Sequence, residues 1–344
     1  MKKLILLILF IGFSVSFFTT NSYGQEINKK EIKVTIDSIS KQLIEGYIYE
    51  DKGKEIATSL KKLYKKGIFD TVQSKKSFSK ALTKTLFDLS NDRHLYVRFT
   101  EGEAPGANRR RVVRMVPGGT TPEGQTPNAE RRVVRRTPQQ RGVPNVNNYG
   151  FDHVEILPNN IGYLKFSMFS SEPEAIKKAD AAMAFLSDVD ALIIDLRGNF
   201  GGSPEMVLHL SSYLFNAPTH LSTSYRRGWD APQERWTLEN ISGKTLVDIP
   251  VYILTSKRTF SAAESFTFGL NNNNRVTIVG ENTGGGGHFG GMVPVGESLQ
   301  MFLPQGRVWN PSTGKGFQST GIEPHHKVPA EEALEKALDL INNN

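Results

Sequence analysis

The stretch VYILTSKRTFSAAESFTFGLNNNNRVTIVGENTGGGGHFGG, residues 251–291, decides the fold. It begins with the apolar run VYIL (251–254), which predicts a short buried strand, and Ala262, Phe266 and Leu270 then recur at helical spacing. A polar turn separates these two segments, so the stretch predicts a strand, a turn and a helix in succession. The RVTIVG run that follows predicts another buried strand, which leads into a glycine-rich loop.

Ser261 stands where the predicted turn becomes the helix. Its hydroxyl would lie beside the free N–H groups and the positive dipole end of the helix. Such a place stabilises an alkoxide, or the oxyanion that forms when the alkoxide attacks a carbonyl. The same residues also match a capping box, with Ser261 as the N-cap and Glu264 at the third helical position. A helix cap and a nucleophile are both open interpretations of Ser261.

A second strand, turn and helix are predicted upstream, in DALIIDLRGNFGGSPEMVLHLSSYLF (190–215). Residues 191–196 are apolar except for Asp195, as expected of a strand buried on both faces. The glycine turn RGNFGG (197–202) allows bare N–H groups to approach a bound atom closely. Neither a Walker lysine nor a GxGxxG pattern is present, so an oxyanion site fits this turn better than a phosphate site.

Four segments together resemble the family of C-terminal processing and tricorn-like serine peptidases, in the branch typified by interphotoreceptor retinoid-binding protein. They are ALIIDLRGNFGGSP (191–204), LTSKRTFSAAE (254–264), VGENTGGGGH (279–288) and GIEP (321–324). Because the order and spacing of several motifs must agree, the match is specific. The resemblance implies an α/β fold with a crotonase- or ClpP-like ββα core, preceded by a small N-terminal helical domain.

The N-terminus has the layout of a secretory signal peptide: two lysines, an apolar run at 4–18, and small or polar residues up to Gly24. We expect cleavage near Gly24 and a periplasmic or secreted protein. The apolar run is short for a membrane span, so no stable membrane insertion is expected. The chain has no Cys, which excludes disulfides and a lipid-modified N-terminal cysteine.

The net charge of +7 is concentrated in one segment. Residues 101–141 contain nine Arg and four Glu, a surplus of five, and Lys2 and Lys3 add two more, so the remainder is balanced. The basic character therefore describes one segment and does not predict a nucleic-acid-binding protein.

Residues 101–148 form a Pro-, Gly-, Thr- and Arg-rich segment in which RRVVR occurs at 110–114 and again at 131–135. One interpretation is a solvated insert or linker. The other is an electrostatic contact between residues 109–141 and an anionic surface. Processing peptidases of the resembling family often carry a PDZ domain in this region, but nothing here has that length or alternating pattern, so no PDZ domain is predicted.

The chain is long enough for two domains with a sizeable core. Helical periodicity predicts three N-terminal helices, and strands alternating with helices predict an α/β catalytic domain. Residues 229–243 look like a surface excursion with no assigned chemistry. The predicted organisation is a signal peptide (1–24), a helical domain (26–89), a loop and strand carrying a histidine (90–100), the Arg-rich segment (101–148) and a catalytic peptidase domain (149–342).

The resemblance carries the general base over to His94, which lies in an Asp-x-His sequence. Histidine is the usual proton acceptor for a serine nucleophile. Processing peptidases use a lysine in a Thr-x-Gly-Lys-Gly motif, but Gly286 stands at that position here, so a Ser/Lys dyad is not expected. By resemblance, the oxyanion donors are the N–H of Ala262 and one from Gly201 or Gly202.

The tricorn-like branch orients its histidine with an acidic residue near the C-terminus, and Gln318 stands at the equivalent position. A neutral amide can fix the histidine tautomer but cannot stabilise the imidazolium as a carboxylate does. Glu264, Glu281 and Glu323 are carboxylates that could take over this role. His288, at the end of the glycine-rich loop, is a second candidate for the base or a residue of the substrate cleft.

We therefore predict an exported serine endopeptidase that acts on peptides or proteins without a metal or cofactor. Ser261 would be the nucleophile, His94 the base and Gln318 the orienting residue. The alternative is a non-catalytic protein that binds a hydrophobic ligand or peptide in the same cleft. Gln318 favours this alternative, whereas the retention of Ser261, His94 and both glycine-bearing turns opposes it. A further alternative is an anion-binding envelope protein organised by the Arg-rich segment.

Overall fold

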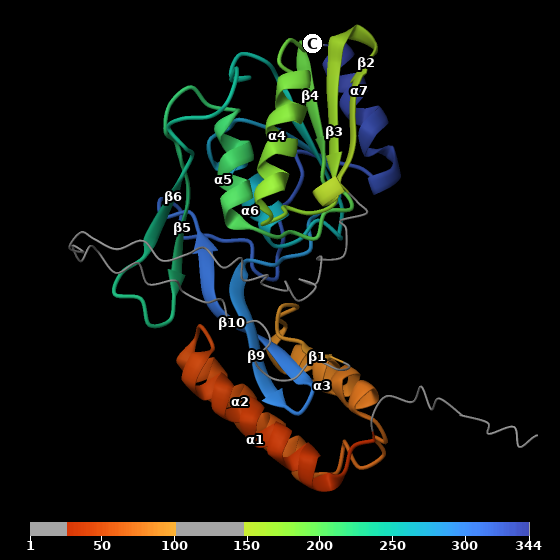
Figure 1. Cartoon of the computed structure of the whole chain (residues 1–344), viewed down its shortest axis with the longest axis vertical. Helices are drawn as coiled ribbons and strands as arrows, with labels where there is room; N and C mark the ends of the chain where they lie inside the picture. The colour runs from red at the N-terminus through yellow and green to blue at the C-terminus, as the bar shows by residue number, and fades with distance from the viewer. Residues whose placement is uncertain (1–25, 101–147, 344) are drawn as a thin grey trace, which may run out of the picture.

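The computed structural model describes residues 26–100 and 148–343. Three N-terminal helices and a five-stranded sheet form one end of the molecule, and a six-stranded sheet covered by helices forms the other (Figure 1). The predicted signal peptide and almost all of the predicted Arg-rich segment lie outside these residues. Within the two described ranges, no helix is both long enough and apolar enough to cross a membrane.

The helices are α1 (Lys29–Gly46), α2 (Glu50–Lys65), α3 (Lys75–Ser90), α4 (Pro173–Phe185), α5 (Pro204–Ser212), α6 (Ala262–Asn272) and α7 (Ala333–Asn342). Short 3₁₀ turns are η1 (Asn148–Gly150), η2 (Pro158–Asn160) and η3 (Ala330–Glu332). The strands are β1 (Val97–Phe99), β2 (Phe151–Leu157), β3 (Ile161–Phe166), β4 (Ala191–Asp195), β5 (His220–Arg226), β6 (Gln233–Trp236), β7 (Val251–Thr255), β8 (Thr277–Gly280), β9 (His288–Gly296), β10 (Leu299–Trp309) and β11 (His326–Lys327).

The six-stranded sheet has the order β11-β8-β7-β4-β3-β2 and is parallel except for β2. Every residue of β4 and of β7 is buried, as their apolar sequences predicted. The two strands are neighbours in the sheet, with Asp195 paired to Leu254 at their carboxyl ends. Because parallel strands end at the same edge, the glycine turn after β4 and the serine turn after β7 lie side by side.

Helices cover both faces of this sheet (Figure 1). On one face α4, α5 and α6 enclose the largest core, in which Phe166, Phe169 and Phe266 pack ring to ring. On the other face α7 packs Ala333 and Ala337 against the sheet. The α/β class predicted from the sequence is confirmed.

The three predicted N-terminal helices are present, and they share a core with the second sheet. Buried side chains of α1, such as Ile39 and Leu43, belong to the same cluster as Met301 and Leu303 of β10. Asn91, in the left-handed conformation with φ 53°, ends α3 and turns the chain toward β1. The loop after α3 therefore leads directly into β1, which pairs with β10 of the second sheet.

The second sheet is antiparallel, with the order β1-β10-β5-β6 and with β9 also paired to β10. Its strand β10 runs from the N-terminal helices to β5, so it connects the two ends of the molecule (Figure 1). Strand β6 lies within residues 229–243, the segment expected to be a surface excursion. Residues 233–236 of this segment form the edge strand of the sheet, because β6 pairs with β5, and most of the segment is exposed.

Candidate active site

The turn after β7 presents Ser261 at the first residue before α6. Ser261 has φ 57° and ψ −116°, a backbone conformation that is uncommon for a residue with a side chain. The turn is anchored to the neighbouring strand, because Thr259 Oγ1 donates a hydrogen bond to Leu196 O at 2.8 Å and Phe260 N donates to Asn199 O at 3.0 Å. These bonds join the serine turn to the glycine turn that follows β4.

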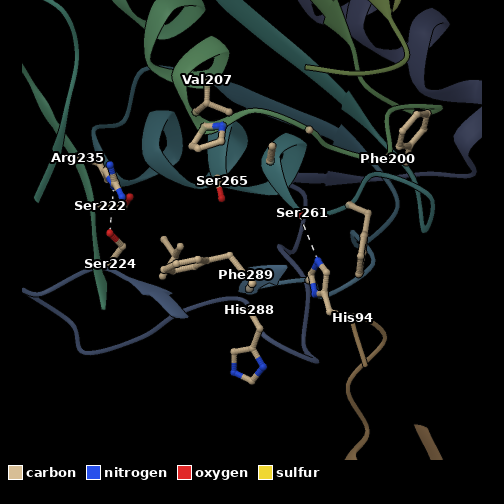
Figure 2. A pocket seen from close by; sticks show the side chains of 18 of the residues that line it. His94, Phe200, Val207, Ser222, Ser224, Arg235, Ser261, Ser265, His288 and Phe289 are labelled. Carbon is tan, nitrogen blue, oxygen red and sulfur yellow. Dashed lines mark hydrogen bonds between the residues drawn. The ribbon is translucent and has the colours of Figure 1, made fainter. Parts of the chain in front are cut away.

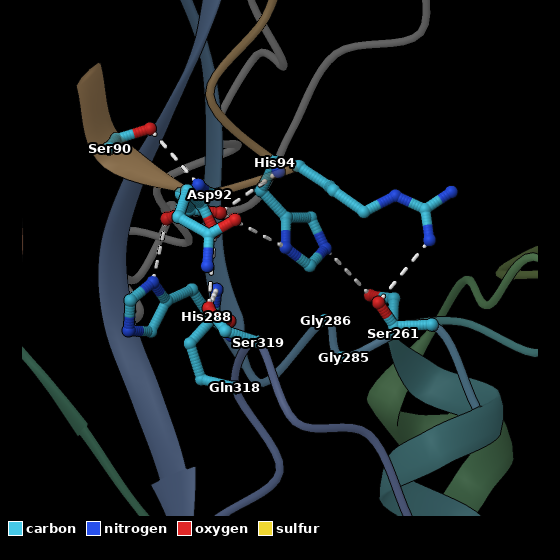
Figure 3. A network of polar contacts seen from close by, with 12 residues as sticks. Ser90, Asp92, His94, Ser261, Gly285, Gly286, His288, Gln318 and Ser319 are labelled. Atoms are coloured by element: carbon cyan, nitrogen blue, oxygen red, sulfur yellow. Dashed lines mark hydrogen bonds and ion pairs between the residues drawn. The ribbon is translucent and has the colours of Figure 1, made fainter. Parts of the chain in front are cut away.

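His94 reaches Ser261 from the loop between α3 and β1. Its Nε2 lies 3.2 Å from Ser261 Oγ (Figure 3). The ring is buried and lies against the ring of Phe260, with 4.6 Å between their centroids. When Nδ1 carries the ring proton, the serine hydroxyl donates to Nε2, which is the arrangement that a general base requires.

Burial lowers the pKa of His94 from its ordinary 6.5 to about 4. The nearby Asp92 carboxylate opposes this change, whereas His288 and Arg93 add to it. The imidazole is therefore neutral at pH 7 and free to accept a proton.

Asp92 is the buried carboxylate next to this imidazole. Its Oδ1 accepts the backbone N–H of His94 at 2.9 Å and lies 3.8 Å from His94 Nδ1. Its Oδ2 accepts Nδ1–H of His288 at 2.7 Å and the Tyr47 hydroxyl at 3.2 Å. Burial by itself would raise the pKa of Asp92, but the hydrogen bond from His288 and the other partners hold it below its usual value. A charged carboxylate thus lies behind the ring (Figure 3).

The structure does not bring Gln318 to His94, where the orienting residue was expected. Gln318 Oε1 accepts the backbone N–H of His288 at 2.9 Å, and its Nε2 donates to Ser319 Oγ at 3.3 Å. The loop of Gln318 packs under the glycine-rich loop, whereas Asp92 comes from the same loop as His94. The further carboxylate Glu323 is exposed.

Glu264 lies beneath the serine turn and not behind the histidine. It accepts the N–H of Ser261 at 2.9 Å, those of Gly285 and Gly286 at 2.6 Å each, and the hydroxyl of Thr283. Burial raises the pKa of Glu264, although its four donors act in the opposite direction. The side chain ties the serine turn to the glycine-rich loop, so its capping bond to Ser261 N is compatible with a nucleophilic Ser261.

The two remaining candidates occupy other places. Glu281 forms an ion pair with Lys257 at 3.4 Å and accepts the backbone N–H of the same lysine. His288 lines the cavity, and its Nδ1 is bound to Asp92, on the other carboxylate oxygen from His94. His288 therefore supports the carboxylate, and His94 is the imidazole within reach of Ser261.

The predicted oxyanion donors lie beside the serine, with one distinction between the two glycines. Gly201 N–H donates to Asn199 Oδ1 at 2.9 Å, so it is already used. The N–H of Phe169 donates to Gly201 O, and Phe169 O accepts the N–H of Ser203. The N–H of Gly202, which lies between these two hydrogen bonds, is therefore directed away from Phe169. Gly202 and Ala262 both line the cavity next to Ser261. These two N–H groups are the better candidates for the oxyanion site.

A cavity of about 550 Å³ opens in front of Ser261 and His94. Its wall is mostly apolar. On the side opposite Ser261, three polar side chains lie together: Arg235, Ser222 and Ser224 (Figure 2). Asp92 and Arg235 were not predicted from the sequence. The Asp-x-His spacing contained a signal for Asp92, whereas no local pattern marks Arg235.

Comparisons with known proteins agree on one family. Residues 160–328 match peptidase family S41, and residues 27–135 match the N-terminal domain of peptidase S41 in eukaryotic IRBP. The carboxyl-terminal-processing protease of Synechocystis sp. is 27% identical over 196 residues, which are 53% of this chain and 44% of that protein. The carboxy-terminal processing protease CtpA of Bacillus subtilis is 27% identical over 180 residues, 51% of this chain and 36% of that protein. The chain thus spans less than half the length of these curated relatives.

Two solved structures share the fold across most of the chain. A putative peptidase from Parabacteroides merdae superposes with a TM-score of 0.58 at 18% identity, covering 90% of this chain and 96% of that one. A lipoprotein from Streptococcus agalactiae superposes with a TM-score of 0.56 at 14% identity, covering 94% and 99%.

Proposed function

Because this chain belongs to peptidase family S41, we propose that it is a serine endopeptidase in which Ser261 is the nucleophile and His94 the general base. The observation that carries the proposal is the 3.2 Å contact between Ser261 Oγ and His94 Nε2, from residues 167 positions apart in the sequence. We further propose a peptide or protein substrate, and an exported protein, as the leader-like N-terminus indicates.

The proposed reaction has two halves. Ser261 Oγ attacks the carbonyl carbon of the scissile bond while its proton passes to His94 Nε2, and the N–H groups of Gly202 and Ala262 hold the oxyanion. The tetrahedral intermediate then breaks its C–N bond, and His94 gives the proton to the leaving amine. A water molecule repeats the sequence on the acyl-enzyme, which releases a carboxylic acid and restores Ser261.

Asp92 supports the catalytic interpretation over the non-catalytic one. The alternative rested on Gln318 in place of an acid, but a charged carboxylate lies 3.8 Å from Nδ1 of His94. This distance is longer than a hydrogen bond, and a movement of about 1 Å closes it, as often happens when a substrate binds. Asp92 would then stabilise the imidazolium that forms in the transition state.

The test is intact-mass spectrometry of the protein after treatment with a fluorophosphonate. We expect one adduct on the wild type, none on Ser261→Ala and much slower labelling of His94→Ala. Ser265→Ala is the matched control: Ser265 lies one helical turn further along α6 and faces the same cavity, but it has no histidine partner in the described part of the chain. This variant should still be labelled. An unlabelled wild type, under conditions that label a known serine peptidase, would contradict the proposal.

A further inference from the structure

The side of the cavity opposite Ser261 is formed by strands β5 and β6. Ser222 pairs with Arg235 across the two strands, and Arg235 Nε donates to Ser224 Oγ at 3.0 Å. Alternate residues of a strand share a face, so Ser222 and Ser224 both line the cavity with the guanidinium (Figure 2). Two hydroxyls and one guanidinium therefore face the cavity together.

The charge at this place has no counter-ion in the described part of the chain. Among the described residues that line the cavity, Arg235 is the single Arg or Lys, and no Asp or Glu occurs. The guanidinium of Arg235 donates one hydrogen bond, to the neutral hydroxyl of Ser224, and no described residue forms an ion pair with this guanidinium. A half-buried guanidinium next to an apolar wall is costly without an anionic partner. The planar group fits a carboxylate, which it can bind through two parallel hydrogen bonds.

Between Arg235 and Ser261, the cavity wall is mostly apolar, apart from the Ser265 hydroxyl. Val207, Leu221 and Phe289 belong to this wall, and Figure 2 shows Phe289 between the Arg235 side and the pair of Ser261 and His94. A substrate whose carbonyl lies at Ser261 would therefore cross an apolar stretch before it meets a positive charge.

We propose that Arg235, with Ser222 and Ser224, forms a subsite for a carboxylate of the substrate. The proposal rests on the proposed function, because it places the scissile carbonyl at Ser261. The carboxylate is either an acidic side chain of the substrate or its free C-terminal group, and both present the same chemistry to the guanidinium. A charge-assisted hydrogen bond of this kind corresponds to about a tenfold to a hundredfold preference over the neutral amide.

The experiment measures binding without turnover, in the Ser261→Ala protein, by calorimetric titration with two matched pairs of peptides. The first pair is acetyl-Ala-Leu-Glu-Ala-amide and its Gln analogue, which tests an acidic side chain. The second pair is acetyl-Ala-Leu-Leu with a free carboxylate and the same peptide as its amide, which tests the C-terminal group. We expect the acid of one pair to bind at least about tenfold more tightly than its neutral partner, and the pair that shows this preference identifies the source.

Substitutions at Arg235 connect the preference to this residue. Adding Arg235→Gln should abolish the preference, and adding Arg235→Lys should retain part of it, because the charge stays while the planar fork is lost. The matched control is Arg98→Gln in β1, whose guanidinium bonds to Gln300 outside the cavity. This variant should keep the full preference. Thermal unfolding of each variant confirms that it is folded.

Three results would overturn the proposal: equal affinities within both pairs, a preference that survives Arg235→Gln, or no binding by either acid. Fluorophosphonate labelling of the wild type separates this failure from failure of the proposed function. A labelled Ser261 without any carboxylate preference refutes the subsite alone. An unlabelled Ser261 with a preference that depends on Arg235 refutes the peptidase and leaves a carboxylate-binding protein.

Discussion

Replacing Asp92 by Asn removes the charge behind the imidazole of His94, the proposed general base, while keeping the shape of the side chain. The remaining carbonyl oxygen can still accept the backbone N–H of His94, as Oδ1 does at 2.9 Å in the structure. The substitution therefore tests the charge more than the position of the loop. We expect a large loss of the rate at which Ser261 reacts with a fluorophosphonate.

The size of the loss follows from the geometry. Oδ1 of Asp92 lies 3.8 Å from Nδ1 of His94. At an effective dielectric constant of about 20, opposite unit charges at this distance attract by about 4 kcal/mol. The imidazolium exists only after the proton transfer, so this energy stabilises the transition state and not the resting enzyme. An energy of about 4 kcal/mol corresponds to about a thousandfold in rate.

The assay is the second-order rate constant of fluorophosphonate labelling across pH, because it needs no known substrate. In Asp92→Asn the rate constant should fall about a thousandfold. The acid limb of the profile should also move to lower pH, because the Asp92 carboxylate raises the pKa of His94 against the effect of burial. A variant that merely loses folded protein would lower the amplitude of labelling without moving this limb.

The control for Asp92 is Gln318→Ala. Gln318 stands where the family resemblance led us to expect the orienting residue, but its side chain bonds to the backbone of His288 and to Ser319. We expect the labelling rate of this variant to stay within about tenfold of the wild type, the equivalent of one neutral hydrogen bond. Labelling of Asp92→Asn within about threefold of the wild type, or a loss of about a thousandfold in Gln318→Ala instead, would show that the Asp92 charge does not support His94.

Four further predictions follow from the same site. Labelling of the wild type should stay constant as pH falls from 7 to about 5 and then decline through about pH 4, since His94 must be neutral; a midpoint near 6.5 in a pH titration would contradict the burial of this ring. The folded-state pKa of His94 lies below its unfolded value of 6.5, so protonation of this ring does not affect the free energy of unfolding above pH 6.5. As pH falls toward 4, the unfolded state takes up the proton first, and the free energy of unfolding decreases by up to about 3 kcal/mol. Urea unfolding of His94→Gln should show a smaller difference in stability between pH 7 and pH 4.5 than the wild type does. Gly201→Ala should lower the labelling rate by at least about a hundredfold, because a Cβ there would lie 2.8 Å from Ala262 N on a backbone with φ 101°; a rate near that of the wild type would show that the oxyanion site lies elsewhere. Glu264→Leu should destabilise the protein by about 3 kcal/mol or more, because three backbone N–H groups lose their acceptor; an unchanged melting temperature would refute the role of Glu264 in holding the two loops.

Local sequence patterns were sufficient for the parts of the site that belong to one segment. The apolar runs of β4 and β7 predicted buried strands, and the glycine and serine turns that follow them predicted where N–H groups and a hydroxyl would be presented. These signals lie within about ten residues of the chain, where periodicity and turn chemistry act. The three N-terminal helices were predictable for the same reason.

Side-chain partners between distant segments were not accessible in this way. Gln318, Glu264, Glu281 and Glu323 were the predicted candidates for the partner of His94, and Asp92 was not among them. The loop after α3 places Asp92 behind the ring, while Glu264 is directed under the serine turn and Gln318 toward the backbone of His288. The choice depends on packing among α3, β10 and the glycine-rich loop, which the tertiary structure alone supplies.

By itself, the sequence determined the strand-turn-helix units and the α/β class, because these depend on short-range periodicity and on residues such as Gly and Ser at defined places. Ser261 as the nucleophile stays a prediction. The tertiary structure decided that His94 meets Ser261 across 167 residues and that Arg235 faces the cavity. The latter depends on the register of β6 against β5, in which Arg235 pairs with Ser222. A shift of this register by one residue would turn the guanidinium to the other face of the sheet, because side chains alternate along a strand.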